Sequence, residues 1–243
     1  AALKDRGFEK IPSYGVEPID VPGAVAGWMT LHERFGKLPL EEVMAPAIRY
    51  AEKGYPVTPN ISRLWQEAFE NYSKYRDRPE FQGWFDTFAP NNTWLKPGEM
   101  FRCPDMAKTL KEIAATKGEA FYRGAIAEKI DAFFKKHNGF LTKEDLAAFK
   151  PEWVDPISVN YHGVDVWELP PNGHGITVLM ALQILKDMNL AERDCADTMH
   201  KQIEAMKLAM VDTAEYVAEP SFMRVSVAVS YTHLRAHETR SNL

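Results

Sequence analysis

A histidine between two glycines is the residue with the clearest chemical potential in this sequence. Gly173-His174-Gly175 precedes an apolar segment, so backbone N–H groups at a helix start could face an anion there, and His174 could act as a general base. The segment lacks the third glycine of a dinucleotide-binding fingerprint, and the sequence indicates no carboxylate that would orient the imidazole. We therefore prefer to interpret it as a tight turn from a strand into a helix.

Metal ligation is the second chemistry that the residue types suggest, and their spacing argues against it. His32-Glu33 begins like the zinc-binding H-E-x-x-H motif, but Gly36 stands where the second histidine would be. Cys103 and Cys195 are the only cysteines, and they have no C-x-x-C spacing. We expect two buried thiols rather than a disulfide framework, and we predict no metal ligand.

Paired acidic residues could serve in acid–base catalysis, but their positions favour another role. Glu41-Glu42 and Glu144-Asp145 fall in the first turns of expected helices, where the helix dipole stabilises negative charge. The sequence contains no Gly-x-Ser-x-Gly nucleophile elbow and no phosphate-binding loop. The residues by themselves thus identify no catalytic group, and the substrate-binding residues stay unknown.

Composition limits the classes of partner. The chain has 243 residues, of which 45% are hydrophobic and 26% charged, as in an ordinary folded protein. Asp and Glu number 34 against 29 Lys and Arg, and this net charge of −5 argues against nucleic acid or anionic lipid as a partner. The apolar run at 178–182 is far too short to cross a bilayer.

Helical periodicity and capping signals account for most of the chain. We expect helices at about 22–35, 40–54, 59–72, 105–117, 119–137, 176–185 and 197–217, with a short helix after Thr142. Pro46 should kink or divide the second of these helices. Residues 1–20 should be loop or extended, and the aromatic, Pro/Gly-punctuated residues 75–102 should form a long ordered loop.

Two local signals are unusually complete. Thr142 and Asp145 have the spacing of a capping box, and Leu141 can pack onto Leu146 as a hydrophobic staple. Between 157 and 168 the apolar period changes to two, with His162-Gly163 at its centre, which predicts a β-hairpin with a two-residue turn.

These elements pose a packing problem. The helix at 176–185 is apolar on nearly all sides, and a two-stranded sheet is only marginally stable by itself. The last helix carries Met199, Ile203, Met206 and Met210 at the spacing of a packing seam. We expect the hairpin to have an unpaired edge and the helix at 176–185 to be poorly covered, so the chain should be part of a layered α+β domain.

Both ends of the chain are unusual. It starts at Ala1 rather than Met, and residues 1–10 contain no apolar run of a signal peptide, which suggests processing or truncation. Residues 230–240 have neither helical nor strand periodicity, and 229–239 resemble the translated reading frame of a transposase-based sequencing adapter. We expect residues 1–227 to be native and 228–243 to be a non-native tail.

Four sets of residues carry a resemblance to a known family. They are VPGAVAG at 21–27 with FGKLPL at 35–40 and APAI at 45–48, then FYRG at 121–124 with IAE at 126–128, then GFLTKEDLAAF at 139–149, and finally YHG at 161–163 leading into PPNGHG at 170–175. Together they resemble the later part of the large subunit of the γ-glutamyltransferase (γ-glutamyltranspeptidase) family, over about residues 21–225.

The resemblance implies an N-terminal-nucleophile hydrolase, a four-layer αββα sandwich formed when a precursor cleaves itself into large and small subunits. This chain would be a mostly helical fragment of that sandwich, with one β-hairpin. Family members transfer the γ-glutamyl group of glutathione and related compounds to an amino acid, a peptide or water. The nucleophile is the threonine exposed at the start of the small subunit, with its own α-amino group as base.

The resemblance carries no catalytic residue onto this chain. The family's nucleophile lies in a Thr-Thr-His-like segment beyond the position of Val225, and no Thr-Thr pair occurs here. The arginine that binds the substrate's α-carboxylate lies before the matched residues. The implied partners are a small subunit, a γ-glutamyl donor and an acceptor, with no cofactor, and neither a cytoplasmic nor an exported location is indicated.

One departure from the family pattern leaves the substrate open. Many transpeptidases have a Pro-Pro-Ser-Ser-Gly-Gly-like loop, whereas this chain has Asn172-Gly173-His174 at the corresponding place. The Asn-Gly form resembles branches that include amidohydrolases and acylases. An amidohydrolase or acylase of the same superfamily is therefore one alternative, and a non-catalytic α+β binding module is another.

Overall fold

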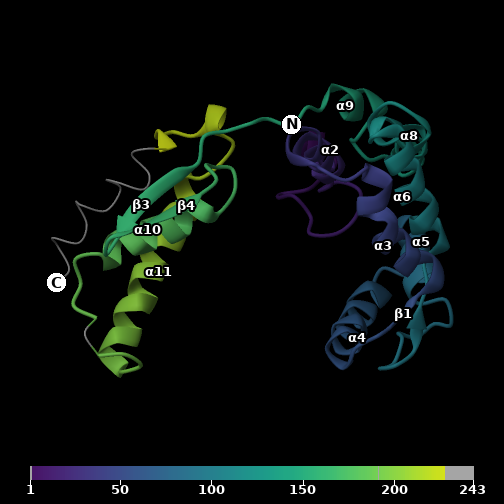
Figure 1. Cartoon of the computed structure of the whole chain (residues 1–243). Helices are drawn as coiled ribbons and strands as arrows, with labels where there is room; N and C mark the ends of the chain where they lie inside the picture. Colours follow the sequence, from purple (N-terminus) through teal and green to yellow (C-terminus); the bar gives the residue numbers. More distant parts are fainter. Residues whose placement is uncertain (1, 191, 228–243) are drawn as a thin grey trace. The chain divides into compact units, whose positions relative to one another are not determined.

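The chain forms two compact units, Ala1–Pro151 and Glu152–Leu243, in a computed structural model that describes residues 2–190 and 192–227 (Figure 1). Most described residues are helical, and the strands form two separate two-stranded antiparallel sheets. This arrangement confirms the expected α+β class. The expected non-native tail at 228–243 lies outside the described residues.

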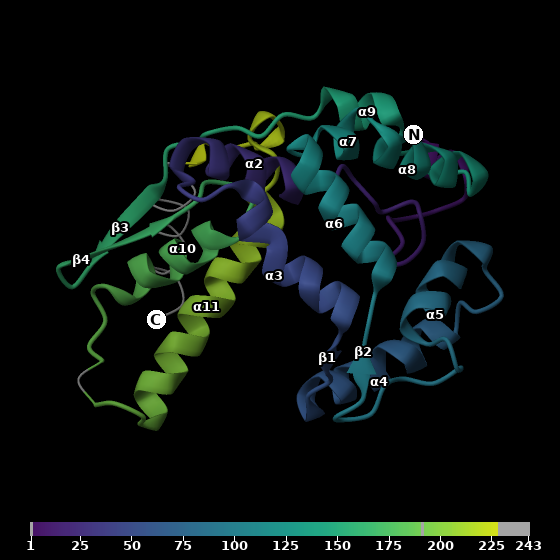
Figure 2. The same ribbon diagram turned by 45° about the vertical axis from the view of Figure 1, so that its right-hand side comes forward.

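The first unit consists of helices with one very short sheet. Its elements are α1 (Ala2–Asp5), α2 (Ala24–Phe35), α3 (Leu40–Lys53), β1 (Tyr55–Pro56), α4 (Pro59–Ser73), the 3-10 turn η1 (Pro79–Phe81), α5 (Gln82–Phe88), β2 (Met100–Phe101), α6 (Pro104–Thr116), α7 (Glu119–Tyr122), α8 (Ala125–Lys136) and α9 (Lys143–Ala148). Helices α3 and α6 lie side by side, as both views show (Figures 1 and 2). The main core lies where α2, α3 and α6 to α9 meet, and Ile113, Phe134 and Leu146 are among its buried side chains.

Two helix predictions need correction. Of the two outcomes expected at Pro46, division of the helix does not occur, because α3 is one continuous helix from Leu40 to Lys53, which packs against α6. The single helix expected at 119–137 is instead α7 and α8, separated at Arg123 and Gly124. At Gly124 an added Cβ would lie 2.9 Å from the backbone of Ala120, so the close approach of the two turns requires glycine there.

The N-terminal residues and the expected long loop contain more structure than their composition indicated. Helix α1 lies within the first residues, and α5 and β2 both lie between 75 and 102. Aromatic contacts hold α5 against α4: the rings of Tyr72 and Trp84 stack at 4.5 Å, and Trp65 Nε1 donates to the carbonyl of Phe88 at 2.9 Å. Tertiary packing of aromatic rings, rather than local periodicity, makes this segment helical.

The capping box is confirmed at the start of α9. The hydroxyl of Thr142 accepts a hydrogen bond from the backbone N–H of Asp145 at 3.2 Å, and the Asp145 carboxylate accepts one from the Thr142 N–H at 2.9 Å. Leu141 and Leu146 are both buried in the main core, in agreement with the predicted staple.

The second unit contains the predicted hairpin and two long helices. Its elements are β3 (Ile157–Tyr161), β4 (Val164–Glu168), α10 (Gly175–Leu185), α11 (Ala196–Tyr216) and the 3-10 turn η2 (Pro220–Phe222). His162 and Gly163 both have positive φ, at 50° and 87°, as a two-residue hairpin turn requires. Asn160 supports the turn, because its side-chain carbonyl accepts from the Gly163 N–H at 3.1 Å and its amide donates to Asp165 at 2.7 Å.

The expectation that the apolar helix would be poorly covered is wrong. Helix α10 packs against α11 and both hairpin strands (Figure 2). Its side chains Ile176 and Leu179 are fully buried. Val178 is an exposed apolar side chain of α10, and α11 exposes more of them, at Met199, Ile203, Met206 and Met210. The unpaired hairpin edges are confirmed among the described residues, where β3 and β4 pair only with each other. Within the same residues, no helix is long and apolar enough to span a membrane.

Replacing Thr142 with Ala should destabilise the first unit by about 1 kcal/mol, because it removes the capping hydroxyl of α9. The measurement is the urea midpoint of unfolding, followed by circular dichroism. Thr93→Ala, at an exposed loop threonine, is the matched control and should leave the midpoint unchanged. Equal midpoints for the two variants would contradict a stabilising cap.

Asp131 predicts a specific pH dependence of stability. This buried carboxylate accepts hydrogen bonds from Lys135 Nζ at 2.6 Å and from the backbone N–H of Lys143 at 3.2 Å. These bonds, chiefly the one from Lys135, hold the pKa of Asp131 below its ordinary value. A carboxyl group with a lowered folded-state pKa stabilises the fold above its ordinary pKa of about 4, and this stabilisation is lost as the pH falls through the folded-state pKa.

Asp131→Asn should therefore lower the thermal midpoint at neutral pH and flatten its decline below roughly pH 4. Asp105→Asn removes an exposed ion pair with Lys108 and serves as the control, with a small effect expected at every pH. Thermal melts across this pH range test the idea, and parallel curves for wild type and Asp131→Asn would rule it out.

Candidate functional site

Tyr122 is the point at which the first three family-like segments meet. Its hydroxyl donates to the carbonyl of Pro22 at 2.7 Å and accepts from the N–H of Ala26 at 3.0 Å. Its ring stacks on Phe149 with a centroid distance of 5.8 Å. Burial raises the pKa of Tyr122, so its hydroxyl stays protonated and can donate the hydrogen bond to the Pro22 carbonyl. The geometry gives Tyr122 a structural role.

A glycine permits this close packing. An added Cβ at Gly23 would lie only 2.9 Å from Cζ of Phe149. Glycine at this position of the 21–27 segment lets the aromatic ring of Phe149 approach the backbone without shifting. The first three family-like segments thus build one core, and none of their side chains that pack there is arranged as a catalytic group.

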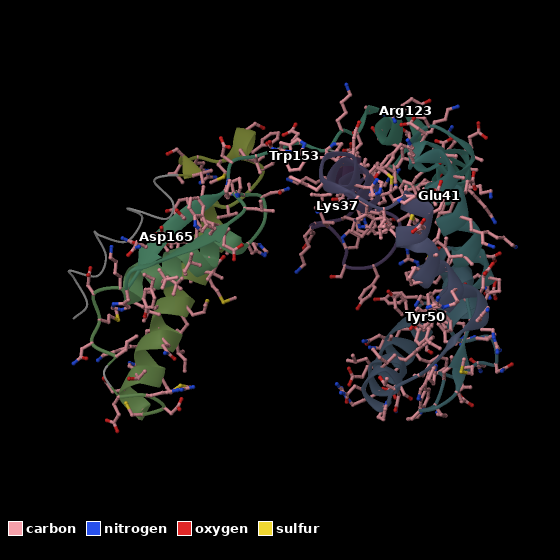
Figure 3. The ribbon with its side chains drawn as sticks, in the orientation of Figure 1. Lys37, Glu41, Tyr50, Arg123, Trp153 and Asp165 are labelled. Atoms are coloured by element: carbon pink, nitrogen blue, oxygen red, sulfur yellow. The ribbon has the colours of Figure 1, made fainter. Side chains whose placement is uncertain are left out.

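Two shallow hollows flank Tyr122 and Arg123 on the surface of the first unit. Their volumes are about 170 and 230 Å³, below the roughly 300–1,000 Å³ of typical ligand pockets. Arg123, which Figure 3 labels at the junction of α7 and α8, donates to both carboxylate oxygens of Glu119 at 3.0 and 3.1 Å. The guanidinium is already paired, so these hollows do not form a developed anion or substrate site.

The loop from β4 to α10 shows what the Gly-His-Gly segment does. His174 is exposed at the N-cap of α10, and its side chain makes no capping hydrogen bond. Among the described residues it has no carboxylate partner. The carboxylate of Glu168 lies against the helix start, because an added Cβ at Gly175 would be 2.4 Å from its Oε2. The positive end of α10 therefore already faces a negative charge, which favours a tight turn over an anion cradle.

Sequence reasoning missed Glu168. Its one available signal was its place at the end of a strand, shortly before a helix start, and only the folded loop brings its carboxylate to Gly175.

The other candidate residues also have structural roles. His32 Nε2 lies 2.8 Å from the carbonyl oxygen of Leu38. An added Cβ at Gly36 would lie 2.4 Å from the backbone oxygen of His32. His32 and Gly36 thus close the turn after α2. Glu41, labelled in Figure 3, and Glu42 lie in the first turn of α3, as predicted. No group of three or more metal-ligating side chains occurs within 2–190 and 192–227.

The cysteines are free, as expected, but they are partly exposed rather than buried. Cys195 is the N-cap of α11, and its sulfur accepts from the N–H of Thr198 at 3.4 Å. This bonding to Thr198 lowers the pKa of Cys195. Cys103 precedes α6, and its backbone N–H donates to the carbonyl of Ala51 at 2.9 Å.

The chain is similar to proteins of a known family. The model of the family described as gamma-glutamyltranspeptidase matches residues 2–243. A glutathione hydrolase proenzyme of Pseudomonas aeruginosa is 33% identical over 233 residues, covering 93% of this chain and 40% of the relative. An acylase ACY 1 proenzyme of a Pseudomonas species (strain V22) is 33% identical over 230 residues, with the same coverage.

Solved structures of an acylase and of a gamma-glutamyltranspeptidase are also similar to this chain. A cephalosporin acylase from Bacillus halodurans has a TM-score of 0.95 and 50% identity, covering all of this chain and 45% of the other. The gamma-glutamyltranspeptidase of Helicobacter pylori has a TM-score of 0.81 and 28% identity, covering 92% of this chain and 64% of the other. The chain spans about 40% of the length of the curated relatives it matches. With its family model matched from residue 2 to residue 243, the chain belongs to the gamma-glutamyltranspeptidase family.

Proposed function

We propose that the protein containing this chain hydrolyses or transfers γ-glutamyl amides, with glutathione and related compounds as the donor class. The observation that carries this proposal is the family match over residues 2–243, together with relatives named glutathione hydrolase. The acceptor would be an amino acid, a peptide or water. No residue of this chain is assigned a catalytic or substrate-contacting role.

The proposed chemistry depends on a threonine outside these residues. Self-cleavage of a precursor would expose its α-amino group, which has an ordinary pKa of about 7.7–8.0 and can take the hydroxyl proton at neutral pH. The hydroxyl oxygen then attacks the amide carbonyl, and preformed hydrogen-bond donors stabilise the tetrahedral oxyanion. Collapse of this intermediate breaks the C–N bond, and the leaving amine takes the proton held by the α-amino group, while the acyl group stays on the threonine oxygen as an ester. Attack on this ester by an amino acid gives transfer, attack by water gives hydrolysis, and either one regenerates the free threonine hydroxyl.

An acylase of the same superfamily is the second candidate. It is supported by the 50% identity to a cephalosporin acylase and by a β4–α10 loop that lacks the serines typical of many transpeptidases. The two candidates share the nucleophile and differ in the acyl group. A non-catalytic binding module has less support, and a stop codon in the gene near Ser226 would favour it over a continuing frame with a Thr-Thr-His-like segment.

A small subunit is the proposed protein partner. The apolar stripe of α11, made by Met199, Ile203, Met206 and Met210, is exposed, as are Trp167 on β4 and Leu169 after it. Apolar surface of this extent in one small unit is typical of a face that further polypeptide covers. We also propose that residues 228–243 are not native, and the nucleotide sequence of the gene tests that directly.

The 243-residue chain by itself should neither hydrolyse γ-glutamyl-p-nitroanilide nor cleave itself, because it contains no Thr-Thr segment and no free threonine amine. The measurements are nitroaniline release and the intact mass of the purified chain. The full-length protein, recovered from its gene, is the positive control. Saturable turnover by the purified fragment would overturn the assignment of the nucleophile.

The β4–α10 loop should influence the choice of donor. In the full-length protein, replacement of Asn172-Gly173-His174 by Ser-Ser-Gly should shift the ratio of kcat/KM for glutathione over an acylated cephalosporin by about tenfold towards glutathione. His162→Asn, in the exposed hairpin turn, is the control and should leave the ratio unchanged. An unaltered ratio in the loop variant, with normal folding and turnover, would exclude the loop from donor selection.

A further inference from the structure

Two Asn-Gly pairs in this sequence share a reactive chemistry. They are Asn138-Gly139 and Asn172-Gly173. In such a pair the backbone nitrogen of the glycine can attack Cγ of the asparagine side chain, forming a C–N bond and releasing ammonia. Water then opens the five-membered succinimide at either carbonyl, which leaves aspartate or isoaspartate. Glycine favours the attack because it has no Cβ to obstruct the ring closure and allows the backbone to rotate freely.

The fold restrains the first pair. The N–H of Gly139, which would have to lose its proton, donates to the carbonyl of Phe134 at 2.8 Å. An added Cβ at Gly139 would lie 2.3 Å from the Phe134 ring, so the backbone has little room to turn. The guanidinium of Arg6 also donates to the carbonyl of Asn138. Attack at Asn138 therefore requires this turn to open first.

The second pair lacks all of these restraints. Asn172 and Gly173 are both exposed in the loop between β4 and α10. Apart from its two chain neighbours, no part of the described chain lies within 4 Å of a Cβ placed on Gly173. Within residues 2–190 and 192–227, neither the Gly173 N–H nor the Asn172 side chain has a hydrogen-bond partner. Among the described residues, the reacting nitrogen therefore has no hydrogen bond that must break before it can attack.

We propose that Asn172 is a site of spontaneous deamidation, while the fold protects Asn138. Conversion adds one negative charge to the loop that already holds the Glu168 carboxylate against the start of α10. The isoaspartate form also inserts a methylene into the backbone of that loop. The modification needs only water and is independent of the enzymatic function proposed above.

The test is peptide mapping by mass spectrometry after incubation of the native 243-residue chain at mildly alkaline pH. Each deamidated peptide gains about 1 Da, and its isoaspartate form separates by chromatography. We expect Asn172 to convert about tenfold faster than Asn138 or more, since Asn138 reacts only when its turn opens. Equal rates at the two sites, or a faster reaction at Asn138, would refute the proposal.

Two controls separate the fold from the local sequence. In urea the two sites should react at similar rates, because both are then unrestrained Asn-Gly pairs. Gly173→Ala should slow the reaction at Asn172 without loss of folding, since the site has space for a Cβ. A reaction at Asn172 that is as fast with alanine as with glycine would also count against ring closure through the residue-173 nitrogen.

Discussion

The buried hydroxyl of Tyr122 holds together segments that are about 100 residues apart in the first unit. A phenol in an apolar core is unfavourable unless its oxygen is hydrogen-bonded, and here the backbone around Pro22 and Ala26 provides both partners. This requirement determines where α2 starts relative to α7. It also brings Phe149 over Gly23, where an added Cβ would lie 2.9 Å from the ring and would force the ring to shift.

The second unit is governed by the burial of apolar surface. Helix α10, the most apolar helix of the chain, packs against α11 and the β3–β4 hairpin. This packing buries Ile176 and Leu179. The cover is provided by one face of α11, and the stripe from Met199 to Met210 stays exposed on another. Packing of α10 therefore leaves apolar side chains exposed on α11. Such exposure is consistent with the greater length of the relatives, since further polypeptide can cover this surface.

Residues that seemed able to do chemistry contribute mainly to the shape of the chain. His32 closes a turn, Glu41 lies in the first turn of α3, and Cys195 caps a helix. The family assignment and the proposed amide chemistry therefore come from the pattern of the whole chain and from its relatives. This division is expected where the proposed nucleophile lies on a segment other than the described residues.

The sequence by itself determined the features that depend on neighbours in the chain. The capping box at Thr142, the hairpin with its turn at His162 and Gly163, and the boundaries of α4 and α10 follow from local hydrogen bonds and apolar periodicity. The family resemblance was also present in the order of its motifs, and the family match over residues 2–243 confirms it. Only the tertiary structure decided the continuity of α3 through Pro46, the helix α5 within an aromatic segment, and the covering of α10 by α11. In these cases contacts between distant segments outweigh local preference, because burial of apolar side chains and pairing of buried polar groups depend on neighbours that the linear sequence does not specify.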